Sequence, residues 1–80
     1  MKDFNSYLTE IGEVGYIESI IHSVFYVSGL PGAKLHELVL TETGQIGVVQ
    51  GILPDLVEVL IFEGSGLTHN IRVVRTNETF

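Results

Sequence analysis

The sequence predicts an all-β domain: a small closed antiparallel barrel of six strands with Greek-key topology and a short N-terminal helix or arm. Short runs of β-branched and aromatic residues recur along the chain, and glycine- or proline-containing turns separate them. Apolar residues make up 45% of the chain, and there is no cysteine to form disulfides. A two-sheet sandwich of the same strands is the alternative, but a closed barrel is favoured because it removes exposed strand edges.

Composition limits the classes of function. The 80 residues correspond to one domain with a thin margin of stability, and the absence of cysteine excludes a thiolate zinc site. Four basic residues against ten acidic ones give a net charge of −6, which argues against binding nucleic acid. The sequence has neither a run of 18 apolar residues nor a signal-peptide pattern. We therefore expect no membrane insertion and a cytoplasmic location.

Residues 1–11 form the predicted N-terminal arm or short helix. Phe4, Tyr7, Leu8 and Ile11 recur at helical spacing. Asp3 lies near the start, where the helix dipole favours a negative charge. Two interpretations follow: a helix packed on its own domain, or part of a docking helix for a partner.

The barrel domain is predicted to span residues 12–77, and its first two strands come directly after the arm. Residues 13–20 alternate imperfectly, with Val14, Tyr16 and Ile20 expected on one side. His22 and Ser23 are a plausible break before the aromatic and β-branched strand 24–27.

The next connection is the most distinctive stretch of the chain. Gly29 precedes Leu30-Pro31-Gly32-Ala33, which has the chemistry of a type II turn. Pro31 presets φ at the second position of this turn, and Gly32 would accept a positive φ at the third.

Four further strands are predicted, at residues 36–41, 45–52, 56–62 and 71–75. Gly44 should supply a positive φ in the tight connection between the first two of them. Residues 53–55 form the next turn, and residues 63–70 form a loop. The chain should fray beyond residue 75, with residues 78–80 as a frayed C-terminus outside the domain.

Strand 56–62 carries the candidate interaction surface. Val57, Val59 and Ile61 can point into the barrel, which directs Leu56, Leu60 and Phe62 outward. Outward apolar side chains are covered either by a loop or helix of the same chain or by another protein. Leu56, Leu60 and Phe62 are therefore the candidate interface.

Catalytic motifs are absent from the sequence. It has no G-x-x-x-x-G-K-[ST] phosphate loop and no G-x-S-x-G elbow, and the triplet Gly64-Ser65-Gly66 is typical of an ordinary loop. His22, His36 and His69 lack the spacing of metal ligands. The residues therefore predict a non-catalytic domain with no catalytic residue, cofactor or metal.

Two other classes stay open. One is a small ligand-binding or enzymatic barrel, for which Tyr26, His36 and His69 are the candidate polar groups. The other is a free-standing adaptor protein.

An ordered series of residues resembles the N-terminal β-barrel domain of rotary ATPase headpiece subunits, and most of all the alpha subunit of F-type ATP synthase. That family runs E-x-G-x-V-x-S-I-G-D-G-I-A-R-V-x-G-L-P, then E-L, and closes on V-x-R-T. Its G-D-G-I-A-R stretch is Ile21-His22-Ser23-Val24-Phe25-Tyr26 here. The matching positions are Glu13, Gly15, Ser19, Ile20, Val27, Gly29, Leu30, Pro31, Glu37, Leu38, Gly44, Gly47, Val73, Arg75 and Thr76.

The resemblance implies a six-stranded barrel with a structural and assembly role. In the parent enzyme, six such barrels form a crown that holds the alternating headpiece subunits together, and nucleotide binds in a following domain. The implied partners are the sister headpiece subunits, which carry a beta-type barrel, and the peripheral-stalk subunit. No ATP chemistry is implied for these 80 residues.

Overall fold

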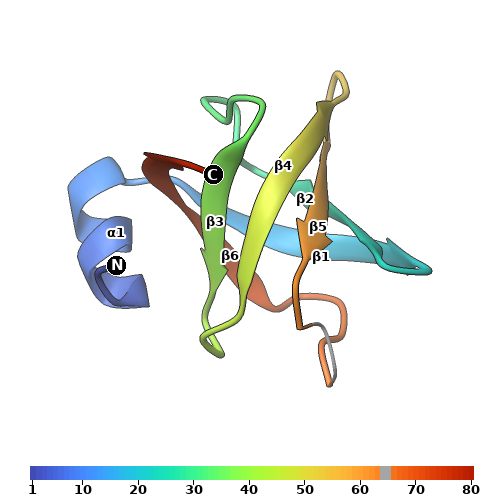
Figure 1. The fold of residues 1–80 in the computed structure, drawn as a ribbon, viewed down its shortest axis with the longest axis horizontal. Coiled ribbons are helices and arrows are strands. Elements are labelled where there is room, and N and C mark those ends of the chain that lie inside the picture. Colours follow the sequence, from blue (N-terminus) through green and yellow to red (C-terminus); the bar gives the residue numbers. More distant parts are fainter. Residues whose placement is uncertain (64–65) are drawn as a thin grey trace.

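The computed structural model describes residues 1–63 and 66–80, and in these ranges the chain forms one helix and six strands (Figure 1). The strands close into an antiparallel barrel in the order β1-β2-β5-β4-β3-β6. Consecutive hairpins join β3, β4 and β5, and β6 returns to pair with β3, which is the Greek-key arrangement. The predicted fold class is confirmed. The elements are α1 (Phe4–Ile11), β1 (Val14–Ile21), β2 (Val24–Ser28), β3 (Glu37–Thr41), β4 (Ile46–Ile52), β5 (Val57–Ile61) and β6 (Arg72–Thr79).

Local capping chemistry defines the two ends of α1. The Asp3 carboxylate accepts a hydrogen bond of 2.9 Å from the Ser6 N–H, and this bond lowers the pKa of Asp3. At the other end, the left-handed Gly12 donates its N–H to the Leu8 carbonyl at 2.9 Å. Both ends of this short helix are therefore capped within the chain.

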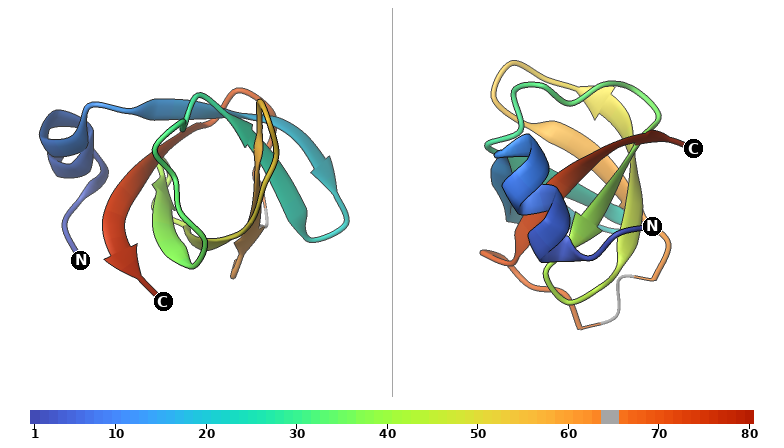
Figure 2. Two further views of the ribbon diagram at one scale, coloured as in Figure 1. Left: turned by 90° about the horizontal axis from the view of Figure 1, so that it is seen from above. Right: turned by 90° about the vertical axis from the view of Figure 1, so that its left-hand side faces the viewer.

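The helix packs on its own domain. Tyr7 is only 1% exposed and contacts Leu40 of β3 and Val74 of β6, which point out of the barrel. Phe4, Leu8 and Ile11 are the partly buried residues around this second core. Figure 2 shows α1 outside the barrel, beside β6 and away from β4 and β5. The interpretation of a helix packed on its own domain is confirmed.

The barrel interior is the main core, and β5 contributes to it as predicted. Val57, Val59 and Ile61 are 5%, 0% and 5% exposed. They pack with inward residues of every other strand and of the connections; the buried members from outside β5 are Ile17, Phe25, Val27, Leu30, Ala33, Val39, Val49, Leu67 and Val73.

The face predicted for the first strand is wrong. Tyr16 is 42% exposed, whereas Ile17 is fully buried. The register against β2 shifts between Ile17 and Ser19, so a β-bulge at this point interrupts the alternation. Because of the shift, Ile20 packs against the same core as Ile17.

The turn after β2 also differs from its prediction. Ala33 donates its N–H to the Leu30 carbonyl at 3.1 Å, so a turn forms at the predicted place. Gly32 does not adopt a positive φ, and the left-handed residue is Gly29 with φ of 81°. The turn is therefore not type II, and Gly32 is needed for space: a Cβ there would lie 2.5 Å from Nη1 of Arg75. In the β3–β4 hairpin, Gly44 has a φ of 94°.

The C-terminal segment is not frayed. Strand β6 continues to Thr79, which pairs with Glu37 after a register shift in β3 between Glu37 and Val39. Phe80 then donates its N–H to the His36 carbonyl at 2.8 Å. The polar composition of this segment suggested a loose end, but its backbone completes the β3–β6 pairing.

In the loop expected at residues 63–70, Gly64 and Ser65 lie outside the described residues, and the interpretation of the Gly64-Ser65-Gly66 triplet cannot be placed on the structure. Leu67 of this loop is buried in the main core.

Replacing Gly15 with alanine tests a close backbone contact of the barrel. A Cβ at Gly15 would lie 2.2 Å from the backbone oxygen of Ser28, so β1 and β2 would have to separate. We expect Gly15→Ala to lower the free energy of unfolding by about 2–3 kcal/mol, measured by urea denaturation. Ser19→Ala on the same strand is the control. Equal stability of the two variants would contradict the close contact.

Candidate functional site

The predicted interface residues flank and occupy β5, and the structure separates them into two places. Leu60 is half-buried in the strand, and Phe62, directly after it, is 54% exposed. Leu56 is half-buried at the other end, where β5 begins. Glu58 lies between Leu56 and Leu60 on the same side of the strand and pairs with Tyr26 and Gly51. The apolar surface is thus interrupted by one carboxylate.

Leu60 belongs to a row of apolar side chains that crosses four strands. It pairs with Val24 of β2 and Val48 of β4, and Val48 pairs in turn with Leu38 of β3. Each of these residues alternates with a buried core residue of its strand, so all four point outward. The barrel therefore has an apolar band on its outer side, in which Val48 is itself buried and Val24, Leu38 and Leu60 are half-buried.

Aromatic residues extend this band at one end. The rings of Phe62 and Phe80 lie 5.5 Å apart between centroids in a tilted arrangement. Phe62 also donates its N–H to the carbonyl of Ile46, which is 37% exposed. We call this surface the β5 face, and it consists of Val24, Leu38, Ile46, Val48, Leu60, Phe62 and Phe80.

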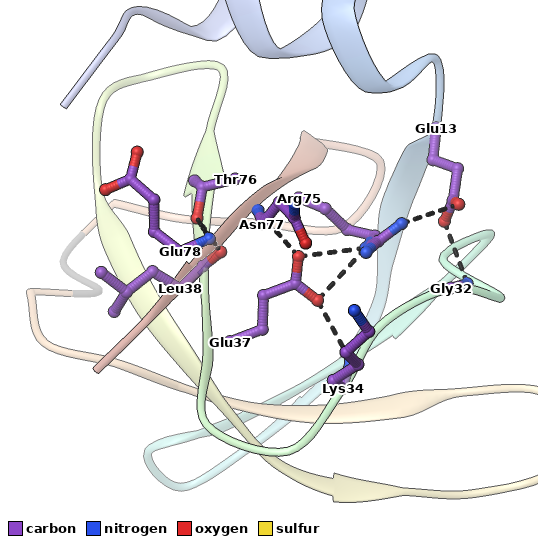
Figure 3. A network of polar contacts seen from close by, with 9 residues as sticks. All are labelled: Glu13, Gly32, Lys34, Glu37, Leu38, Arg75, Thr76, Asn77 and Glu78. Atoms are coloured by element: carbon purple, nitrogen blue, oxygen red, sulfur yellow. Dashed lines mark hydrogen bonds and ion pairs between the residues drawn. The ribbon is translucent and has the colours of Figure 1, made fainter.

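A buried polar cluster is centred on Arg75 of β6 (Figure 3). Its Nε lies 3.2 and 3.1 Å from the two carboxylate oxygens of Glu37, and its Nη1 lies 2.9 Å from Oε2 of Glu13. Glu37 is 1% exposed and Arg75 is 8% exposed. The guanidinium therefore joins β6 to the residue just before β1 and to the first residue of β3.

Backbone N–H groups also donate hydrogen bonds to the two carboxylates. Glu37 accepts hydrogen bonds from the N–H groups of Lys34 at 3.0 Å and Asn77 at 2.9 Å. Glu13 accepts one from the Gly32 N–H at 3.1 Å. Burial opposes the charge on Arg75, but the hydrogen bonds and charges of Glu37 and Glu13 outweigh it and raise the pKa of Arg75.

This cluster is built to hold segments together. Within the described residues, no buried side-chain nitrogen or oxygen lacks a hydrogen-bond partner. Sequence reasoning did not predict that these groups meet, because they are far apart in the chain. The available signal was that Glu13, Glu37, Arg75 and Thr76 all matched one family pattern.

A second polar contact fixes the helix to β6. The Tyr7 hydroxyl donates a hydrogen bond to the Glu78 carboxylate and accepts one from the Lys2 N–H at 3.0 Å. Burial raises the pKa of Tyr7, and the bond to Glu78 raises it further. Thr76, two residues before Glu78, donates its hydroxyl to the Leu38 carbonyl at 2.7 Å.

The candidate polar groups of a ligand-binding barrel are not brought together. Tyr26 is half-buried in the middle of β2. His36 lies just before β3 and His69 just before β6, and these strands are antiparallel, so the two histidines are at opposite ends of the barrel. His22 is exposed in the β1–β2 hairpin with a φ of 57°. In residues 1–63 and 66–80, no group of three potential metal ligands is found.

The described part of the chain also has no helix with the length and apolar character needed to span a bilayer.

Comparison with known proteins identifies relatives. The chain is 38% identical over 66 residues to ATP synthase subunit alpha of Orientia tsutsugamushi, a match that covers 82% of this chain and 12% of that protein. It is 36% identical over 70 residues to ATP synthase subunit alpha 2 of Cereibacter sphaeroides, covering 86% of this chain and 14% of that protein. No family model matches the chain. The chain thus spans only a small part of these relatives, and the resemblance to the alpha subunit is confirmed.

Removing the guanidinium tests the central ion pair. Arg75→Met leaves the buried Glu37 carboxylate without its cation, so we expect a loss of about 3–5 kcal/mol in the free energy of unfolding. The matched control is Arg72→Met on the same strand. Its partly exposed pair with Glu42, at 3.5 Å, should contribute less than about 1 kcal/mol. Urea denaturation compares the two variants, and equal losses would contradict a central role for Arg75.

The double variant Glu37→Gln/Arg75→Met distinguishes loss of the pair from loss of packing. Removing both charges should recover part of the stability lost in Arg75→Met, because the fully buried carboxylate is then neutral and only the more exposed Glu13 keeps an unpaired charge. A double variant that is less stable than Arg75→Met alone would contradict this explanation.

Alkaline titration tests the Tyr7 contact. Because the pKa of folded Tyr7 is raised, its contribution to stability is complete below the unfolded value of about 10 and is lost as the pH rises through the folded value. We expect Tyr7→Phe to cost about 1–2 kcal/mol at pH 7. In a pH titration followed by absorbance at 295 nm, this variant should also lack the tyrosine ionisation seen at the highest pH. Tyr16→Phe on the exposed face is the control, and an unchanged late phenolate in Tyr7→Phe would contradict the assignment.

Proposed function

We propose that this chain, which resembles ATP synthase alpha subunits over most of its length, is a non-catalytic assembly domain of an alpha-type subunit. In this role it holds a hexameric headpiece together through contacts between barrels. The proposed partners are sister headpiece subunits with a beta-type barrel and the peripheral-stalk subunit. The domain would serve ATP synthesis and proton transport on the cytosolic face of the membrane.

The β5 face is the observation that supports a contact with other barrels. Apolar side chains on the outside of a small barrel need either a covering element of the same chain or a partner. The helix α1 covers Leu40 and Val74 on the β3–β6 side, and it does not cover β5 (Figure 2). The outward residues of β5 therefore remain available to a neighbour.

The polar clusters support a non-catalytic role. The Arg75 guanidinium is bonded to two carboxylates, and those carboxylates accept backbone N–H groups. Both carboxylates and two nitrogens of the guanidinium are engaged within the domain, which favours a role in holding its segments together. The network supports the shape of the barrel rather than a reaction.

A free-standing barrel that binds a ligand or acts as an adaptor is the second candidate. A hollow of about 330 Å³ at one end of the barrel favours it, because pockets for small ligands begin at about this size.

Charge substitutions on the β5 face test the assembly role. Phe62→Glu and Leu60→Glu should each weaken association with the beta-type headpiece subunit by about 30-fold or more, because a buried apolar anchor is worth roughly 2 kcal/mol. The measurement is sedimentation of the mixed proteins, and circular dichroism checks folding.

Tyr16→Glu is the control for Phe62→Glu. Tyr16 is a 42% exposed aromatic residue against 54% for Phe62, and it pairs with Ser28 and Arg72, which lie outside the β5 face. Unchanged association of Phe62→Glu, or an equal loss in Tyr16→Glu, would contradict the proposed interface. If Leu60→Glu unfolds, Phe62→Glu still decides the question, since its side chain is exposed.

A further inference from the structure

The barrel has a hollow at one of its open ends. The candidate interface residues account for only part of its lining. It lies between the β2–β3 and β4–β5 connections, which meet at the same end of the barrel (Figure 1). Its floor is formed by core residues: Val27, Leu30 and Val57 are 0%, 4% and 5% exposed. The floor of the hollow is therefore the nearly fully covered end of the apolar core.

The rim of the hollow is apolar and exposed. Ile52 and Leu53 are 52% and 41% exposed, and Leu56 also lines the hollow. Leu53 donates its N–H to the Leu56 carbonyl at 2.9 Å, which closes the tight β4–β5 turn and keeps these side chains at the rim. Apolar groups above an apolar floor gain free energy when a further apolar group covers them.

One charge marks the rim. Asp55 is exposed and is the titratable residue among those that line the hollow. In the described residues it forms no ion pair. Lys2, Arg72 and Arg75 are each paired with carboxylates elsewhere, and Lys34 of the β2–β3 connection does not line the hollow. A cation at the rim would therefore have to come from a partner.

We propose that this hollow, here called the mouth pocket, binds an apolar side chain of a partner peptide segment that places a lysine or arginine beside Asp55. The wide, exposed rim leaves room for a side chain entering from a second protein, whereas a small molecule bound there would stay exposed over part of its surface. The net charge of −6 favours the same basic partner through electrostatic attraction. This proposal is independent of the β5 face and of the alpha-type role.

Three blocked peptides that differ in one charge test the mouth pocket: acetyl-Gly-Leu-Leu-Lys-Gly-amide and the same peptide with glutamine or glutamate in place of lysine. Each is titrated into the ¹⁵N-labelled 80-residue chain, and backbone amide shifts are followed by NMR. We expect saturable shifts at Leu30, Leu53, Asp55 and Leu56. The lysine peptide should bind about threefold more tightly than the glutamine peptide, and the glutamate peptide should bind least.

Substitutions separate the charge from the apolar contact. Asp55→Asn should remove the preference for the lysine peptide and leave the glutamine peptide unchanged. Leu53→Ser should weaken all three peptides by about fivefold, because part of a leucine side chain is no longer buried. The matched control is Leu35→Ser, since Leu35 is 51% exposed in the β2–β3 connection but does not line the mouth pocket.

Three outcomes would overturn the proposal: shifts that do not saturate, shifts centred away from the mouth pocket, or a lysine preference that survives in Asp55→Asn. Because Asp55 and Leu53 are exposed, we expect these variants to stay folded. The dispersion of the amide signals in the same NMR spectra checks this. Variants of the β5 face do not enter this experiment, so its failure would leave the assembly proposal standing.

Discussion

The ion pair between Arg75 and Glu37 is the contact on which the arrangement of the barrel depends. An unpaired charge at this depth would be strongly destabilising, so both side chains must meet for the fold to form. Their partners include backbone N–H groups of the β2–β3 connection and of β6, which fixes both segments relative to β3. Such a pair adds little net stability over an apolar core, but it permits only one register of these segments. We infer that specificity of the fold is its main contribution.

The close approach of glycines complements this pair on the other side of the same connection. A Cβ at Gly29 would lie 2.8 Å from the Val14 carbonyl, so the chain after β2 lies directly against β1. Gly32 leaves the space that Arg75 and Glu13 occupy. In the stretch around Pro31, close backbone contact at Gly29 and buried charge beside Gly32 therefore meet, and a Cβ at either glycine would come within 3 Å of a neighbouring atom.

Much of the fold could be predicted from local patterns, whereas the central cluster could not. The inward residues of β5 and the amphipathic face of α1 follow from periods of two and of about 3.6, which the sequence displays directly. The prediction for the two faces of β1 was wrong because a bulge at Glu18 shifts the alternation of inward and outward side chains. No local sequence pattern indicates this bulge. The end of β6 was missed because pairing with Glu37 orders a polar segment that its own composition does not. Long-range contacts, unlike periodicity, leave no local pattern.

The small size of the domain explains why apolar surface stays uncovered in two places. A chain of this length has few elements to spare, and its single described helix is used on the β3–β6 side, where Tyr7 closes the second core. The β5 face and the mouth pocket lie away from that helix, and both are bordered by carboxylates, Glu58 and Asp55. An apolar surface with an acidic border repels acidic neighbours, including copies of this chain, and favours partners that bring a complementary charge. The uncovered surfaces are therefore better suited to selecting a partner than to indiscriminate association.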